Sequence, residues 1–374
     1  MTIRPTVALA LLCMCLTGCK KSPDEGGEVR IKSIKRIDTP DTPARPKRPR
    51  QRPPRRYSEQ VTHDPSSVLG GEQGLDHVGV AVKDLNEAGQ IYTRLGFGNP
   101  QEGTLPNGLR NINFYFGDTT YLELVTYYDK AKNPWVASFV DRHEKGAMFL
   151  MLCVFSYTHT ANFLRARHLE VENPLPGRIE SHRAKKAAAQ PGRKKAPMWL
   201  NFFLKGKTLP GNVTFIAYNR GLRNFTLGKL KDEKIRRKSF THPNTVLGLR
   251  SAWIAVDNLA QGRKAFEAIG LKAGRRFDDT RIDARGVAIA AGQGTLRLLQ
   301  PRVKGRGPVA AFLKRRGQGI IGLGFEVENV KTAGALIEER LKTPVKLYDG
   351  LLGKSVLVPA DQALDVYLEF AQRP

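Results

Sequence analysis

A histidine and a glutamate that can act together lie in two apolar segments of the chain. His77 falls within GLDHVGVAV, and Glu123 falls within YLELV. Successive side chains of a β-strand point to opposite faces, so His77 shares a face with small residues while the three valines line the other face. If the segments form neighbouring strands, His77 and Glu123 share that face. The pair then suits a general base with its orienting partner, two ligands of a divalent metal, or a polar pair buried in the fold.

Nearby residues on the same segments are candidates for substrate binding. Arg110 and Asn111 open the segment LRNINFY, and Tyr121 is in phase with Glu123. Arginine and asparagine donors suit a carbonyl or carboxylate, although edge or turn positions would explain them as well. Tyr121 either lines a cavity or packs in the core. We therefore expect His77 and Glu123 as catalytic residues, and Asn111, Arg110 and Tyr121 as substrate-binding residues.

The strand and helix that follow His77 recur along the chain. The spacing from Val82 to Gly96 equals that from Val256 to Gly270, at 14 positions each. A further copy begins at Gly319 and ends in VYLEF, and the weakest copy begins at Ala147. Repeated spacing of this kind indicates one supersecondary unit used several times. The sequence therefore predicts an α+β fold of four βαβββ units, numbered 1 to 4 in chain order.

This plan resembles the vicinal oxygen chelate superfamily. Within it, GLDHVGVAVKDL, LRNINF, YLELV and HPNTVLGLRSAWIAVDNL are similar to segments of the glyoxalase-like domain family. The resemblance implies two cupped half-barrel pairs of the glyoxalase and extradiol-dioxygenase type. Units 1 and 2 would form a glyoxalase-like domain over residues 71–245, and units 3 and 4 a second such domain over 246–374. In metal-using members, ligands from the first and last strands hold a divalent ion that chelates vicinal oxygens of the substrate.

The ligand set that such a metal needs is incomplete in this chain. Zinc and iron sites usually take three or four protein ligands, drawn from two units. Apart from His77 and Glu123, the matching positions provide one carboxylate, in unit 4. We therefore expect a divalent metal to be weakly bound, if bound, and the second cup to be structural, with His242 as a linker residue. The positions aligned with His77 and Glu123 are Leu150 and Ala217 in unit 2, Ser251 and Leu298 in unit 3, and Gly322 and Glu369 in unit 4.

The N-terminal segment has the layout of an export signal. Residues 1–18 carry a basic residue near the start and an apolar core too short to span a bilayer. The following LTGC resembles the bacterial lipobox, which implies lipidation of Cys19; an ordinary secretory signal is the alternative. Lys20 after the cysteine indicates outer-membrane sorting. We expect a protein of the bacterial cell envelope, anchored in the outer membrane through a lipid at Cys19 and facing the periplasm.

Residues 19–70 are poor in apolar side chains and rich in proline, so they are predicted to form a disordered tether. RPKRPRQRPPRR within it has seven basic residues and no acid. It either binds anionic envelope lipid or polymer, or serves as a solvated spacer. The chain has a formal net charge of +26. Nucleic acid is not expected as a partner, because an exported chain seldom meets it and no aromatic residues interleave the basic runs.

Two classes of function are compatible with these features. One is an envelope-anchored enzyme of glyoxalase-like type, acting on a small oxygen-rich substrate through His77 and Glu123. The other is a non-catalytic ligand-binding or scaffold lipoprotein with a degenerate site. The retained pair in unit 1 favours the enzyme, whereas the loss of ligands in the other units favours the binding protein.

Overall fold

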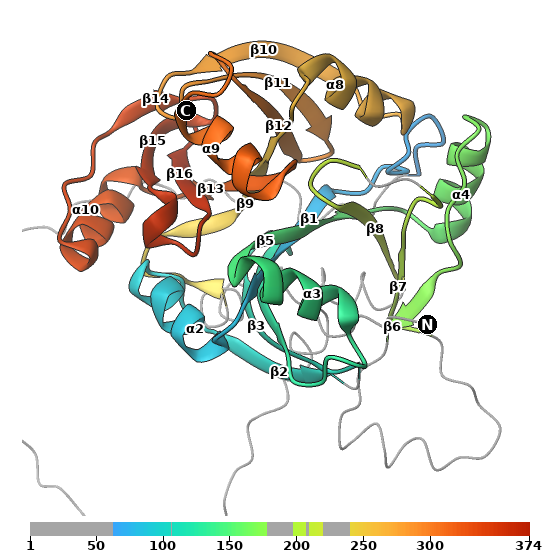
Figure 1. The fold of residues 1–374 in the computed structure, drawn as a ribbon, viewed down its shortest axis with the longest axis horizontal. Helices are drawn as coiled ribbons and strands as arrows, with labels where there is room; N and C mark the ends of the chain where they lie inside the picture. Colours follow the sequence, from blue (N-terminus) through green and yellow to red (C-terminus); the bar gives the residue numbers. More distant parts are fainter. Residues whose placement is uncertain (1–62, 106, 178–196, 207–208, 220–239) are drawn as a thin grey trace, which may run out of the picture.

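The computed structural model describes residues 63–105, 107–177, 197–206, 209–219 and 240–374. The export signal, Cys19 and most of the predicted tether lie outside the described residues. The described chain forms two curled half-barrel sheets of eight strands each, with helices packed on them (Figure 1).

The first sheet comes from units 1 and 2, in the order β2-β3-β4-β1-β5-β8-β7-β6. At its centre β1 pairs in parallel with β4 and antiparallel with β5, so the two units join along one strand pair. Its strands are β1 (Gly74–Val82), β2 (Gln101–Leu105), β3 (Leu109–Tyr115), β4 (Tyr121–Tyr127), β5 (Lys145–Cys153), β6 (Leu175–Gly177), β7 (Trp199–Phe202) and β8 (Val213–Tyr218).

The second sheet comes from units 3 and 4 and repeats this topology, in the order β10-β11-β12-β9-β13-β16-β15-β14. The predicted four-unit plan is therefore confirmed. Its strands are β9 (Val246–Ala255), β10 (Ala273–Asp279), β11 (Ala284–Ala291), β12 (Gly294–Pro301), β13 (Gly319–Val327), β14 (Tyr348–Gly350), β15 (Gly353–Val358) and β16 (Tyr367–Gln372).

The first helix of units 1, 3 and 4 begins after a side-chain cap. Asp84, Asn258 and Asn329 precede these helices, and each accepts hydrogen bonds from backbone amides of the first turn. Such caps satisfy amide groups that have no partner inside the helix. The repeated cap explains why the strand-to-helix spacing recurs. The helices are α2 (Leu85–Arg94), α3 (Pro134–His143), α4 (Tyr157–Arg165), α8 (Leu259–Ala268), α9 (Gly307–Arg316), α10 (Val330–Leu341) and the short 3-10 helix η1 (Ala360–Gln362).

Two helices, α3 and α9, link the units of each pair and lie outside the repeated pattern. Each has a proline in its first turn, where the missing amide hydrogen costs nothing. Val136 of α3 packs in one cluster with Phe149, and Val309 of α9 packs in another with Trp253. The linker helices therefore cover part of the concave faces, which we call the first cup (units 1 and 2) and the second cup (units 3 and 4).

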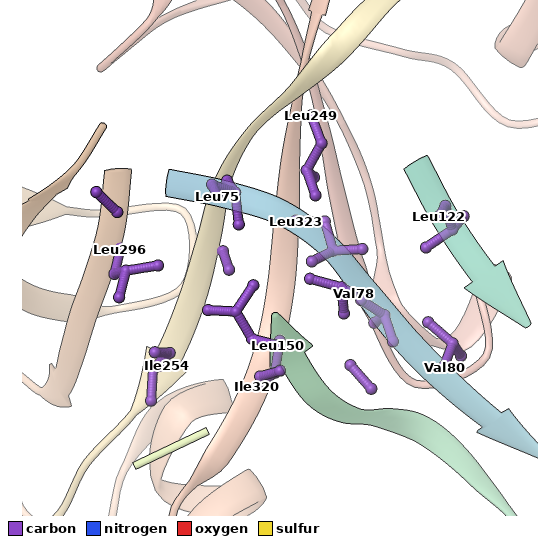
Figure 2. Packing of buried hydrophobic residues seen from close by; sticks show 14 of the residues in the cluster. Leu75, Val78, Val80, Leu122, Leu150, Leu249, Ile254, Leu296, Ile320 and Leu323 are labelled. Carbon is purple, nitrogen blue, oxygen red and sulfur yellow. The ribbon is translucent and has the colours of Figure 1, made fainter. Parts of the chain in front are cut away.

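The main hydrophobic core lies between the two sheets. Val78 and Val80 of β1 face it together with Ile254 and Leu323 of the second sheet (Figure 2). The three valines of β1, together with Ile254 and Val256, are buried, since none is more than 2% exposed. The opposite face of β1 therefore belongs to the first cup, as the phase of His77 requires.

The predicted tether ends earlier than residue 70. Val68 and Leu69 are buried in the main core, and their carbonyls accept hydrogen bonds from Thr160 Oγ1 and the amide of Phe155. This short apolar pair has enough neighbours to order the segment before β1. The prediction of disorder is therefore wrong for these residues, because it averaged them with the polar stretch that precedes them.

Candidate functional site

A β-bulge in β1 places Asp76 beside His77. The β1–β5 register shifts between Leu75 and His77, so one extra residue is accommodated there. Leu75 and Val78 both face the core as a result, and the two polar residues between them come together. Asp76 Oδ1 lies 2.7 Å from His77 Nδ1. The carboxylate is fully buried and the imidazole is 3% exposed.

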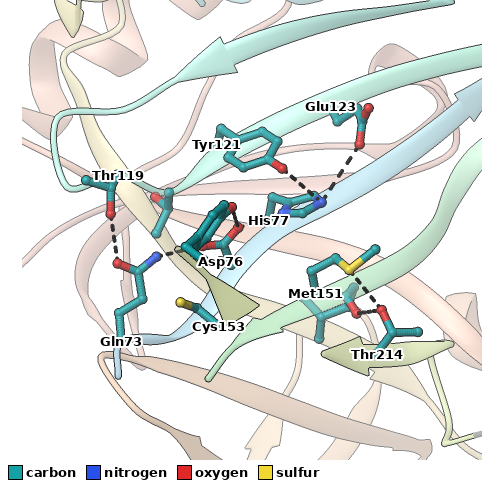
Figure 3. Close-up of polar contacts among 12 residues, drawn as sticks. Gln73, Asp76, His77, Thr119, Tyr121, Glu123, Met151, Cys153 and Thr214 are labelled. Carbon is teal, nitrogen blue, oxygen red and sulfur yellow. Dashed lines mark hydrogen bonds and ion pairs between the residues drawn. The ribbon is translucent and has the colours of Figure 1, made fainter. Parts of the chain in front are cut away.

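Asp76 is held by further donors. The Tyr218 hydroxyl donates to its Oδ1 at 2.9 Å, and Gln73 Nε2 donates to its Oδ2 at 3.0 Å. Gln73 is fixed in turn by the Thr119 hydroxyl, which donates to Gln73 Oε1 (Figure 3). Because a carboxylate only accepts, the imidazole hydrogen sits on Nδ1. Nε2 of neutral His77 is then left as an acceptor.

Nε2 of His77 faces Glu123 and Tyr121 of the neighbouring strand (Figure 3). Its distance to Glu123 Oε2 is 3.8 Å, and the Tyr121 hydroxyl donates to it at 3.1 Å. Asn111 Nδ2 donates to Glu123 Oε1 at 2.7 Å. The prediction that His77 and Glu123 share one face is confirmed, and the structure joins Asn111 and Tyr121 to them.

Burial shapes the electrostatics of this group. Burial raises the pKa of the Glu123 carboxyl, against the opposing influence of His77 and the Asn111 hydrogen bond. The Tyr121 pKa is raised well above its ordinary value, mainly by burial and also by nearby Tyr218 and Asp76. Glu123 therefore keeps its proton to higher pH than an exposed glutamate, and the Tyr121 phenol remains a donor.

Asn113 belongs to the same wall of the cup and was missed by sequence reasoning. It lies directly opposite Glu123 in the β3–β4 register and is fully buried. Neither its Oδ1 nor its Nδ2 has a hydrogen-bond partner in the described structure, and Asn111 Oδ1 has none either. The signal was present, because Asn111, Asn113 and Tyr115 alternate in phase along β3.

Arg110 does not join the group, contrary to the substrate-binding role predicted for it. It is exposed and adjoins Asn111 on β3, so alternation places its side chain on the other face. Asp76 joins the group although it was not expected there, since strict alternation placed its side chain on the face away from His77. The pattern Leu75-Asp76-His77-Val78 carried the signal, because two polar residues between core residues break the two-residue period.

Unit 2 supplies an aromatic and a hydroxyl residue where unit 1 has His77 and Glu123. In the second sheet Ser251 pairs with Gly324 and Trp253 with Gly322. The matching pairs of the first sheet are His77 with Met151 and Gly79 with Phe149. Gly322 is the unit 4 position aligned with His77, and it pairs with Trp253 as Phe149 pairs with Gly79. Phe149 therefore occupies the unit 2 position that corresponds to His77. Met151 pairs in turn with Thr214, so Thr214 occupies the unit 2 position that corresponds to Glu123. The predicted equivalents Leu150 and Ala217 both pack in the main core instead.

This set of residues does not fit a resident transition metal. His77 and Glu123 provide two ligands, and the described residues contain no group of three or more His, Cys, Asp or Glu side chains placed to hold an ion. The Phe149 ring covers Gly79, where a Cβ would lie 2.1 Å from Phe149 Cζ. An aromatic ring thus occupies the part of the cup from which unit 2 would contribute a ligand.

The second cup is filled by its own ion pairs. Arg297, not the predicted Leu298, occupies the position of Glu123 in unit 3, because it pairs with Trp253 as Glu123 pairs with Gly79. Leu298 faces the main core. Arg297 Nη2 lies 2.6 Å from Glu369 Oε2, and both side chains are at least 99% buried.

The other carboxylate oxygen of Glu369 also has partners. Arg281 Nη1 lies 3.2 Å from Glu369 Oε1, and the Tyr348 hydroxyl donates to the same atom at 3.0 Å. Arg281 also pairs with Asp279 and lies over the Tyr348 ring. The two arginines are balanced by Glu369 and Asp279, as a structural half requires, although Arg297 Nη1 has no hydrogen-bond partner in the described structure.

His242 connects the two halves of the molecule. The Gly98 amide donates to its Nδ1 at 2.9 Å, and its Nε2 donates to the Tyr115 carbonyl at 3.0 Å. Burial lowers the His242 pKa to about 4, although the Tyr115 hydrogen bond acts in the opposite direction. Its position agrees with the linker role expected from the sequence.

Cys153, also buried, lies on β5 with its Sγ 3.9 Å from Glu72 Oε2.

Comparisons with solved structures identify the fold. A triple mutant of 4-hydroxymandelate synthase from Streptomyces coelicolor aligns over 81% of this chain and 93% of its own, with TM-score 0.54 and 15% identity. A hypothetical protein from Staphylococcus aureus aligns over 80% and 98%, with TM-score 0.51 and 12% identity. These similarities show the vicinal oxygen chelate fold. Methylmalonyl-CoA epimerase from Mycobacterium tuberculosis aligns over 35% of this chain and 90% of its own, with TM-score 0.31 and 19% identity.

Sequence comparison identifies the family. No curated protein sequence matches the chain significantly. Among the helices of the described residues, none is long and apolar enough to cross a membrane. The profile of the glyoxalase-like domain matches residues 75–282, more than half of the chain, including β1, β3 and β4 with their polar wall. The chain belongs to the glyoxalase-like domain family.

Proposed function

We propose that the first cup binds a small oxygen-bearing molecule and moves a proton on it. The observation that carries the proposal is the Asp76–His77 contact at 2.7 Å, which orients the imidazole and leaves Nε2 turned toward Glu123. A positioned base beside a carboxyl group with a raised pKa is the arrangement that general acid–base catalysis needs.

The proposed step is an isomerisation by proton transfer. The Tyr121 hydroxyl gives up its hydrogen bond to His77 Nε2 when the substrate binds. His77 Nε2 then accepts a proton from the carbon next to a carbonyl group, while protonated Glu123 donates one to the carbonyl oxygen. The C–H electrons form the carbon–carbon double bond of an enol, and the carbonyl π electrons take up the donated proton. Asp76 stabilises the imidazolium that forms, and Asn111 holds Glu123. The step needs no resident metal.

Ligand binding without turnover is the second candidate. The self-neutralised pair of Arg297 and Glu369 in the second cup favours it, because half of the molecule has lost the polar site. In that case His77 and Glu123 would contribute hydrogen bonds to a captured ligand.

We also propose the cellular setting implied by the N-terminal segment. A lipid at Cys19 would anchor the protein in the bacterial envelope, and the basic tether would contact anionic lipid or polymer. The formal net charge of +26 supports this partner class.

The proposed reaction is tested by proton exchange on hydroxyacetone in deuterated water, followed by NMR. The full mature chain should accelerate loss of the C–H signals next to the carbonyl. His77→Gln should lose this acceleration, whereas Arg110→Gln, altered on the other face of β3, should retain it. Equal exchange rates with the wild-type protein and His77→Gln, while both bind the compound, would leave the binding function in place of the enzyme.

A further inference from the structure

Asn113 is a buried amide with an unused donor and an unused acceptor. The side chain is fully buried, and neither polar atom has a partner in the described structure. Buried polar groups in native proteins are nearly always hydrogen-bonded, so an amide left open in this way requires an explanation. Its place opposite Glu123 in the strand register puts it in the wall that carries Asn111 and faces the cup.

The charges around this wall disfavour anions. Asp76 and Glu123 bring two carboxyl groups to the cup. In the described strands β1 to β8, Arg110 and Lys145 are the only arginine or lysine residues, and both are exposed. Among the described strands of this sheet, a carboxylate or phosphate ligand would therefore meet the carboxylate of Asp76 and the carboxyl group of Glu123 and no buried lysine or arginine.

We propose that Asn113 is the recognition residue of the first cup and that the ligand is an uncharged molecule with a donor and an acceptor side by side, as on the edge of a carboxamide. Such an edge pairs with both open atoms of the Asn113 amide at once. Asn111 Oδ1 accepts a further donor, such as a ligand hydroxyl. The assignment rests on the proposed function only for the place of the ligand, not for the proton transfer.

Glycolamide and glycolate provide a matched pair of probes, because they differ mainly in replacing a neutral amide by a carboxylate. Binding is measured at neutral pH from side-chain amide signals in ¹H–¹⁵N spectra of the full mature chain. The wild-type protein should bind glycolamide at least tenfold more tightly than glycolate, with the largest shift at the Asn113 side chain. Arg110→Gln serves as the control and should bind both probes as the wild type does.

Asn113→Leu separates recognition from structure. Replacement of the open amide by an apolar group of similar size should leave the melting temperature unchanged or raise it, while glycolamide binding falls at least tenfold. Asn113→Asp, which keeps the size and adds a charge, should also lose glycolamide. A lower melting temperature with intact binding in Asn113→Leu would make Asn113 structural and overturn the proposal.

The remaining outcomes are equally decisive. Equal affinity for the two probes, or no saturable binding of glycolamide, would overturn the ligand class. His77→Gln should still bind glycolamide, because recognition lies with Asn113. If the wild-type protein binds glycolamide but exchanges no protons on hydroxyacetone, the proposed reaction fails while the recognition role of Asn113 stands.

Discussion

Asp76 and His77 are neighbours in the chain and hydrogen-bond to each other at 2.7 Å. Neighbours in a regular strand point to opposite faces, and the bulge in β1 removes that constraint. The same bulge returns Leu75 to the core side, so the contact is built without exposing an apolar residue. Asp76 thus orients the imidazole, a role that the sequence had suggested for Glu123.

Asp76→Asn should slow proton exchange on hydroxyacetone by roughly 10²–10⁴-fold, because an amide no longer fixes the hydrogen on Nδ1 or stabilises the imidazolium. Imidazole ¹⁵N shifts should report a changed tautomer of His77. Tyr218→Phe is the matched control, since it removes one donor to Asp76 and leaves the imidazole contact. Equal losses in the two variants would show that Asp76 acts only through general packing.

Val80→Ala should lower the free energy of unfolding by roughly 1–3 kcal/mol, because it leaves a cavity in the core between the sheets. Val80 is fully buried. Val303→Ala provides the control, since Val303 is 49% exposed and should change stability by less than about 0.5 kcal/mol. Urea unfolding measures both, and equal effects would contradict the burial of Val80 between the two sheets.

Arg297→Met should cost about 3 kcal/mol, because Glu369 would lose a partner in a site from which water is excluded. Pairing this change with Glu369→Gln should recover most of the loss, since the buried charge is then removed as well. Lys130→Met breaks an exposed ion pair with Asp141 and should cost less than about 1 kcal/mol. Additive losses in the double variant, measured by urea unfolding, would contradict a coupled pair.

The low pKa of His242 predicts loss of stability in acid. The folded-state pKa is about 4, against an ordinary value of 6.5. As pH falls below the ordinary value, the unfolded chain takes up a proton that the folded chain does not, so stability decreases toward pH 4 and then levels off. The total is about 3 kcal/mol.

Urea unfolding of the wild-type protein and His242→Gln between pH 7 and pH 4 isolates this contribution. Glutamine can replace both hydrogen bonds of His242 but does not titrate. The stability difference between the two proteins should therefore shift by about 3 kcal/mol over this range. A difference that does not vary with pH would assign the acid sensitivity to other groups.

Cys19→Ala should release the protein from the membrane fraction or leave it unprocessed, because the lipid anchor would have no attachment site. Membrane fractionation and palmitate labelling of cells that express the full chain measure the effect. Cys153, which lies outside the N-terminal segment, is a suitable control, and Cys153→Ala should keep the label. Unchanged fractionation and labelling in Cys19→Ala would exclude the lipid anchor.

The repeated architecture and the shared face of His77 and Glu123 could be predicted from local sequence patterns. The strand-to-helix spacing of a unit and two-residue alternation are local properties, and each can be read within about 20 residues. Val82 to Gly96 and its copy at Val256 to Gly270 were therefore enough to predict matching units. The alternation around Val80 was enough to separate the face of β1 that carries the valines from the face that carries His77.

The details that depend on partners across strands could be assigned only from the folded structure. The bulge that brings Asp76 to His77 depends on the β1–β5 register, and the same kind of pairing selects Arg297 over Leu298 and Phe149 over Leu150. A shift of one residue reverses the face of a side chain, so small errors of alignment changed the expected site. The open amide of Asn113 also required the fold, because a missing hydrogen-bond partner is a property of everything packed around the group and cannot be assigned from the residue alone.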